Sequence, residues 1–208
     1  MMILSPPYRC VPWKNGLGTT LELATDALSE GGAWSWRLSI ADVPCRAAFS
    51  SFPGVTRHIN CLHGEGLVLH RSPAGGKTPH GKRERAKVPR VGNGFVFEGE
   101  EQVDGEPLGP GVQDINLMVN RTQWTGALSI ERDELSAGVM SSGTIIFHYA
   151  QGAAPLELTV HGEGQTVQLE VGSTLITSGL VTITPRKREG KDSCTLVIAN
   201  LWPRSALG

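Results

Sequence analysis

Short runs of β-branched and apolar residues recur along this chain, and a glycine or proline ends almost every one of them. The 26 glycines and 13 prolines among 208 residues interrupt the sequence too often for long helices. Such segments predict an all-β sandwich or barrel with few short helices, the helical candidate lying near 132–135. The ranges predicted as strands are 19–24, 34–43, 56–62, 67–70, 95–97, 112–119, 127–131, 143–149, 156–160, 166–171, 173–176, 181–185 and 195–201.

The charge balance limits the partners of the protein. The net charge is −1 and the isoelectric point is about 6.6, so no global field attracts nucleic acid or an anionic membrane. No apolar run approaches the length of a membrane span, and the N-terminal segment lacks the charged start of a secretion signal. We therefore expect a cytoplasmic protein without nucleic-acid or membrane partners, whose scattered cysteines form no disulfides.

The segment Trp13–Glu22 combines a cation, an amide, hydroxyls and a carboxylate beside an indole ring. Gly16 and Gly18 would let its backbone adopt a positive φ or approach a ligand closely. It is not a phosphate-binding loop, because the glycine spacing and the Lys-Ser/Thr ending of such loops are absent. The segment is either part of a binding site or only a turn that leads into the strand predicted from Thr19.

A second segment, Phe49–Arg57, contains a Phe-Pro-Gly turn that delivers Arg57 to the first turn of the next strand. An arginine held inside a barrel would clamp an anion, because its planar fork matches a carboxylate in two parallel hydrogen bonds. The alternatives are a surface arginine, or one that is paired internally with Glu22 or Asp114.

A third polar group is formed by Asp114 and Asn116, which share one face of a predicted strand. Alternation cannot say whether that face points into a barrel or into solvent. The residues that would project into one cavity are Lys14, Thr20, Glu22, Arg37, Ser39, Arg57, Asp114 and Asn116.

The histidines do not form the His-x-His pair with a spaced glutamate that barrels use to bind metals, so no metal is predicted. No Gly-x-Ser-x-Gly elbow is present either. The stretch 71–93 is basic and broken by glycine and proline, and it is interpreted as a solvated hairpin or loop. The tripeptide 64–66 is repeated at 162–164, each time after an apolar run that ends in histidine, which favours a duplicated barrel.

Five pieces follow one another between about Tyr8 and Arg121: Pro12–Glu22, Trp36–Ala41, Phe49–Gly54 with Arg57, Leu62 with Gly64 and Gly66, and Asp114–Met118. In the order and spacing of these pieces, this part of the chain resembles the HutD/Ves family, which is associated with histidine utilisation. Two features depart from the family pattern. Leu17 stands where the family often has a glycine, which would strain or alter the loop, and the segment 71–93 is unusually basic.

The resemblance implies a bicupin, one compact unit over residues 1–208 with an N-terminal cupin barrel over about 1–121 and a C-terminal barrel over about 122–208. It further implies a bacterial cytoplasmic protein without the usual cupin metal ligands or any cofactor. In the N-terminal barrel, Arg57 would anchor the carboxylate of a urocanate-like or formylglutamate-like metabolite. The other residues that would bind this ligand are Trp13, Lys14, Asn15, Thr19, Glu22, Asp114 and Asn116.

Three functions are consistent with these residues. The first is a non-enzymatic sensor that binds the carboxylate and modulates histidine utilisation. The second is a metal-free isomerase or hydrolase with Glu22 or Asp114 as base and Lys14 as acid or electrophile, since such chemistry needs paired groups in one pocket. The third is an interaction protein with a vestigial pocket. In each case a homodimer is the default assembly.

Overall fold

The computed structural model describes residues 1–13, 16, 18–27, 33–72, 84–133, 135, 138–184 and 193–204. These residues form antiparallel strands and no helix, which confirms the all-β prediction; accordingly, the described part contains no helix that could cross a membrane. The helix predicted near 132–135 is wrong. Arg132 is the last residue of a strand, and the Asp133 N–H donates to the Cys194 carbonyl at 2.9 Å, so the backbone is bonded to a neighbouring segment instead.

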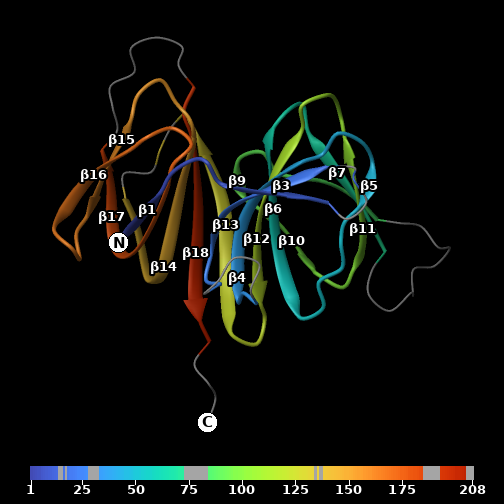
Figure 1. Ribbon diagram of the computed structural model, residues 1–208, viewed down its shortest axis with the longest axis horizontal. Helices are drawn as coiled ribbons and strands as arrows, with labels where there is room; N and C mark the ends of the chain where they lie inside the picture. The colour runs from blue at the N-terminus through green and yellow to red at the C-terminus, as the bar shows by residue number, and fades with distance from the viewer. Residues whose placement is uncertain are drawn as a thin grey trace.

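The C-terminal part of the chain forms an eight-stranded sheet, sheet A, in the left lobe of Figure 1. The strand order is β16-β15-β17-β14-β18-β13-β9, and β1 pairs with β17 beside this path. Two strands from the N-terminal half thus complete this sheet. The bounds are β1 Met2–Leu4, β9 Gly92–Asn93, β13 Trp124–Arg132, β14 Gly138–Gln151, β15 Leu156–Val160, β16 Gln165–Leu169, β17 Thr174–Thr184 and β18 Thr195–Pro203.

The right lobe of Figure 1 contains two further sheets. Sheet B has six strands in the order β10-β6-β12-β4-β3-β2, and sheet C has four in the order β5-β11-β7-β8. In sheet B the bounds are β2 Arg9–Pro12, β3 Thr19–Thr25, β4 Trp36–Asp42, β6 Val55–His63, β10 Phe95–Glu98 and β12 Gln113–Asn120. In sheet C they are β5 Ala47–Ala48, β7 Leu67–Ser72, β8 Glu84–Lys87 and β11 Gln102–Pro107.

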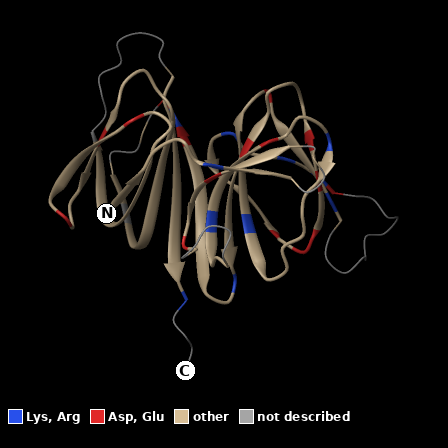
Figure 2. Cartoon of the chain, in the orientation of Figure 1, with Lys and Arg blue, Asp and Glu red and all other residues tan. Residues whose placement is uncertain are grey.

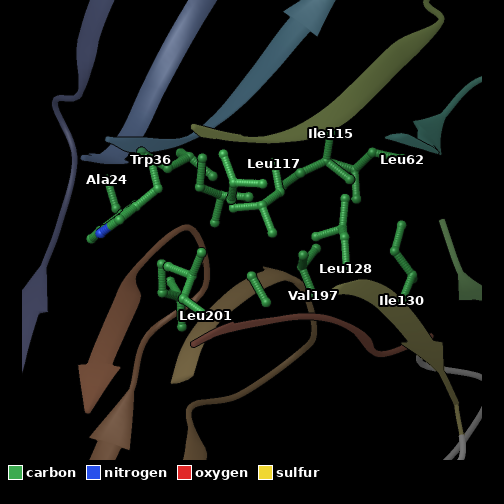
Figure 3. Close-up of a cluster of buried hydrophobic side chains, with 14 residues drawn as sticks. Ala24, Trp36, Leu62, Ile115, Leu117, Leu128, Ile130, Val197 and Leu201 are labelled. Carbon is green, nitrogen blue, oxygen red and sulfur yellow. The ribbon is translucent and has the colours of Figure 1, made fainter. Parts of the chain in front are cut away.

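The central strands β6 and β12 of sheet B are buried on both faces. Leu117 points from one face toward Leu128 and Val197 of sheet A, in the cluster drawn in Figure 3, and Leu38 belongs to the same cluster. The opposite face turns toward sheet C, where Ile59 belongs to a separate apolar cluster. Each fully buried Leu or Ile side chain contributes about 1.5–3 kcal/mol. Sheet B therefore lies between sheet A and sheet C. One of its faces contributes side chains to the apolar cluster with sheet A, and the other faces sheet C.

Some strands differ from the sequence prediction. The ranges 173–176 and 181–185 are predicted as two strands, but β17 runs from Thr174 to Thr184 without a break, with Gly179 at a φ of 82° in its middle. A glycine tolerates this conformation, so the strand continues through it. The strand β11 is not predicted, because Asp104, Gly105 and Glu106 have little strand propensity. Gly105 instead leaves room for the Phe49 ring, 3.0 Å from where a Cβ would stand.

The basic segment 71–93 is a hairpin in its described part, since β7 and β8 pair with Arg71 opposite Glu84. The Arg71 Nε donates to Glu84 Oε2 at 2.7 Å, so part of the positive charge is neutralised locally. Residues 73–83 lie outside the described part of the chain. Figure 2 shows acidic and basic residues scattered over this lobe without a single basic face in that view.

The two repeated Gly-Glu-Gly tripeptides occupy connections of different kinds. Residues 64–66 join β6 of sheet B to β7 of sheet C, whereas residues 162–164 close the hairpin between β15 and β16 of sheet A. In the second connection the Glu163 N–H donates to the Val160 carbonyl at 3.2 Å. The similarity of the tripeptides is therefore one of local sequence and not of place in the topology.

Candidate ligand-binding site

A cavity of about 160 Å³ opens on the inner face of sheet B. Four adjacent strands of that sheet, β6, β12, β4 and β3, supply most of its polar wall. Its volume is below the roughly 300 Å³ at which pockets for drug-sized molecules begin, so it suits a small metabolite. The lining residues are Trp13, Thr20, Arg37, Ser39, Ala41, Ala48, Phe49, Ser50, Phe52, Arg57, Asp114, Asn116 and Met118.

Strand register arranges the polar side chains in rows on this face. In the first row Met118 of β12 lies between Arg57 of β6 and Arg37 of β4. In the next row Asn116 pairs with Ser39, and beyond it Asp114 pairs with Ala41. Because side chains of directly paired residues point to the same side of a sheet, both arginines and both acceptor residues face one cavity.

Arg57 is the most enclosed cation of the site, with only 6% of its surface exposed. Its guanidinium carbon lies 4.8 Å from the ring centre of Phe49 and 5.0 Å from that of Phe97. One terminal nitrogen donates to the Ser50 carbonyl at 3.4 Å, and Nε has no partner in the described structure. Burial lowers the pKa of Arg57 to about 10, an effect that Asp114 opposes and Arg37 reinforces. The aromatic rings hold the cation by cation–π attraction and leave donors available.

Asp114 is the acidic counterpart and is 1% exposed. Its Oδ1 has no hydrogen-bond partner in the described structure. Burial raises the pKa of this carboxyl to about 7; the Arg57 charge acts in the opposite direction, and Asp42 adds to the increase. No ion pair joins Asp114 to Arg57 among the described residues, so neither alternative pairing of Arg57 considered above is formed.

Arg37 is the second cation of the cavity. Its guanidinium carbon lies 5.0 Å from the Trp34 ring centre and 5.7 Å from that of Phe52, and one terminal nitrogen is 3.3 Å from the Met118 sulfur. Its Nε also has no partner in the described part of the chain, and burial lowers its pKa. Phe52 stands near both guanidinium groups, since it is also 5.9 Å from Arg57.

Trp13 and Thr20 form part of the cavity wall. The Trp13 indole N–H donates to the Thr20 hydroxyl at 2.9 Å, and the Trp13 backbone N–H donates to the Gly18 carbonyl at 2.9 Å. Gly16 has a φ of 69°. At Gly18 a Cβ would stand 2.8 Å from the Asp42 carbonyl oxygen and 3.0 Å from the indole. One glycine therefore allows the turn, and the other allows the close approach of the Trp13 ring.

Gly18→Ala is expected to lower the free energy of unfolding by about 1–3 kcal/mol, because its Cβ overlaps backbone and ring atoms that cannot both move aside. The displaced indole would also lose its hydrogen bond to Thr20. Urea denaturation followed by tryptophan fluorescence measures the change. Thr20→Val is the matched control, since it removes the same hydrogen bond without steric overlap and should cost less. Equal stability of Gly18→Ala and the wild type would contradict the close contact.

The predicted site residues separate into three groups. Trp13, Arg57, Asp114 and Asn116 line one cavity. Thr19 and Glu22 are not among the lining residues: the Thr19 hydroxyl donates to Asp42 at 2.8 Å, and Glu22 lies 3.7 Å from Arg9. Glu22 shares the face and the row of Ser39 but sits at the edge of the site. The predictions for Lys14, Asn15 and Leu17 concern positions outside the described residues.

Several lining residues are absent from the predicted binding set. Met118 is two residues after Asn116 on β12, on the same face as Asp114 and Asn116, so strand alternation alone could have predicted that it lines the cavity. Phe49 and Phe52 flank Arg57 from the loop between β5 and β6. In the sequence, only the Phe-Pro-Gly turn marks this loop, and it does not indicate that both rings lie near the same guanidinium.

Neither histidines nor cysteines form a cluster in the described part of the chain. No group of three or more His, Cys, Asp or Glu residues is placed there to hold a metal ion. The four cysteines are free thiols, and Cys10 and Cys45 are exposed whereas Cys61 is buried. Burial raises the pKa of the Cys61 thiol, and a thiol of this kind is a weak nucleophile.

The HutD family model matches residues 5–195 of the chain. A curated relative from Pseudomonas putida, an uncharacterized 21.2 kDa protein in the hutC 3' region, is 35% identical over 117 residues. That alignment covers 56% of this chain and 56% of the relative, so the chain spans little more than half the length of the relative it matches.

Solved structures share the architecture over nearly the whole chain. A conserved protein of unknown function from Pseudomonas aeruginosa PAO1 is 27% identical with a TM-score of 0.72, covering 96% of this chain and 97% of that one. HutD from Pseudomonas fluorescens SBW25 is 23% identical with a TM-score of 0.65, covering 98% and 99%. A Bacillus subtilis oxalate decarboxylase variant is 8% identical with a TM-score of 0.63, covering 96% and 77%. The last two show the fold alone, and they confirm the predicted cupin class.

Proposed function

The chain belongs to the HutD family, and on that premise we propose that its cavity binds a small carboxylate metabolite and that the protein modulates histidine utilisation. The gene neighbourhood in the name of the Pseudomonas putida relative, the hutC 3' region, supports the pathway. The structure of Pseudomonas fluorescens HutD is described as a formate condition, and formate is the simplest carboxylate.

The observation that carries this proposal is the state of Arg57. A buried cation is normally paired, because removing a charge from water is costly. Arg57 is 6% exposed, has no ion-pair partner among the described residues and keeps an unpartnered Nε at the cavity. A carboxylate ligand would supply the missing negative charge and accept the hydrogen bonds that the guanidinium offers.

A urocanate-like or formylglutamate-like molecule agrees with the size and lining of the cavity. The Trp13 indole and the Phe52 ring would contact its apolar part, while Arg57 holds the carboxylate. The proposal retains the cytoplasmic location, the division into barrels near residue 121, the homodimer and the absence of a cofactor that the sequence predicts.

A metal-free enzyme is the second candidate function, and Asp114 is the residue that favours it. A carboxyl with a pKa of about 7 is suited to general acid–base catalysis near neutral pH. Glu22, the other predicted base, does not line the cavity and lies beside Arg9. The enzymatic alternative therefore depends on Asp114.

A thermal-shift panel of urocanate, formylglutamate, formate, glutamate and histidine tests the proposal. A ligand at about 100 times its dissociation constant adds about 2.7 kcal/mol, and each kcal/mol raises the Tm by roughly 2–4 °C for a chain of this size. We expect a selective increase that disappears in Ala48→Trp, in which a bulky ring obstructs the cavity from an exposed position.

No increase in Tm with any of the five compounds would count against the proposal. NMR spectra of the same incubations, recorded over hours, would reveal chemical conversion of a compound. Conversion that depends on Asp114 would support the enzymatic alternative over the sensor.

A further inference from the structure

The cavity collects buried polar atoms that lack hydrogen-bond partners. Seven such side-chain atoms occur among the described residues, and four of them belong to cavity residues. Two are donors, the Nε atoms of Arg37 and Arg57, and two are acceptors, the Oδ1 atoms of Asp114 and Asn116. Buried donors and acceptors are rarely left unpaired in folded proteins, so a molecule bound in the cavity would be expected to pair with these four atoms.

The donors and acceptors lie at different ends of the site. Both arginines flank Met118, whereas Asn116 and Asp114 come earlier on β12. A strand rises about 3.4 Å per residue, which separates the Met118 and Asp114 backbone positions by roughly 14 Å. The register therefore places the two arginines at one end of these polar rows and Asp114 at the other, with Asn116 between them.

We propose that the site selects a carboxylate whose other end carries an N–H donor, and that Asp114 is the residue that determines this specificity. This inference rests on the proposed function, since it assumes that a carboxylate occupies the arginine end. An N–H group at the acceptor end would donate to Asp114 Oδ1, with Asn116 Oδ1 as a second acceptor.

The same atoms reject ligands of the wrong polarity. An ether or ester oxygen at the acceptor end would face carboxylate and amide oxygens and would leave them unpaired. A site built to bond an N–H discriminates strongly against an analogue that lacks it, because the buried acceptors of the protein then have no partner.

Two pairs of closely similar compounds test the inference by isothermal titration calorimetry at pH 8, where the Asp114 carboxyl is mainly ionised. The first pair is urocanate and 3-(2-furyl)acrylate, in which a furan ring, with one oxygen and no N–H, replaces the imidazole ring. The second pair is succinamate and monomethyl succinate, in which an ester replaces the amide. In each pair we expect the N–H compound to bind at least about tenfold more tightly.

Asp114→Leu removes both oxygens while it keeps the branching and the number of heavy atoms of the side chain, and it should bring the affinity ratio within each pair to within about twofold of unity. Asp114→Asn keeps one oxygen and should give an intermediate affinity ratio. This variant tests the role of Asp114 even if Asp114→Leu folds poorly. Glu157→Gln is the matched control, because it removes a carboxylate on β15 of sheet A, away from the cavity lining, and its ratios should equal those of the wild type.

The outcomes separate the two proposals. Equal affinities within both pairs for the wild type would overturn the N–H selectivity while leaving carboxylate binding intact. Unchanged ratios in Asp114→Leu would overturn the role of Asp114. Failure of all four compounds to bind would overturn the proposed function itself, and the inference with it.

Discussion

Arg57→Met is expected to lower the affinity of the cavity for a carboxylate at least about 100-fold. Two charge-assisted hydrogen bonds are worth about 1.5–3 kcal/mol each, and a loss of roughly 2.7 kcal/mol already corresponds to a factor of 100. Methionine keeps an apolar side chain beside the Phe49 and Phe97 rings but offers no donor. Calorimetric titration with the compound that gives the largest thermal shift measures the loss.

Arg57→Lys separates charge from geometry. Lysine keeps the positive charge but loses the planar fork, so we expect an affinity between those of the wild type and Arg57→Met. Arg46→Met is the matched control, since the Arg46 side chain is 51% exposed and lies near Asp104 instead of in the cavity. Wild-type affinity in Arg57→Met would show that the carboxylate binds elsewhere, and an equal loss in Arg46→Met would point to a general effect of net charge.

Asp114→Asn is expected to change how stability depends on pH. The pKa of Asp114 is about 7 in the folded protein and 3.8 in its unperturbed state. A raised pKa stabilises the fold fully below pH 3.8, and this contribution is lost as the pH rises through about 7. The shift corresponds to roughly 4 kcal/mol. The free energy of unfolding of the wild type should therefore fall relative to that of Asp114→Asn by up to this amount between about pH 4 and pH 8.

Urea denaturation of both proteins at pH 5, 6, 7 and 8 gives the difference directly. The charges that act on Asp114 are those of Arg57, which opposes the raised pKa, and of Asp42, which adds to it. Glu157→Gln, on β15 in the other lobe, shows whether loss of any carboxylate gives the same profile. Parallel profiles for the wild type and Asp114→Asn would mean that Asp114 does not titrate in this range.

Strand alternation predicts much of this structure because it depends only on local pattern. It places Trp36 and Leu38 on opposite faces from Arg37 and Ser39, and the structure agrees. It cannot say that both faces of β4 are buried, since that follows from sheet B lying between two other layers. Pairings between distant segments, such as β1 with β17, leave no local signal in the sequence.

The site is predictable to the extent that its residues sit in strands of clear period. Asp114 and Asn116 satisfy that condition, and the Phe-Pro-Gly turn identifies Arg57 as a residue with a fixed position. Glu22 is also on a regular strand, but its place at the edge of the site depends on the lateral order of the strands. The sequence cannot predict that Arg57 and Asp114 form no ion pair, because two such residues could equally well be paired. Only their positions in the folded structure decide this.

The crossing of β1 and β9 into sheet A has a consequence for how the chain reaches its native state. Met2 must find Ile176, and Gly92 must find Ile130, before sheet A is complete. Such contacts close long loops, which slows folding because the entropy of closure is lost before the strand pairs form. Opening of either lobe also removes strand partners from the other. The lobes are therefore expected to unfold as one cooperative unit.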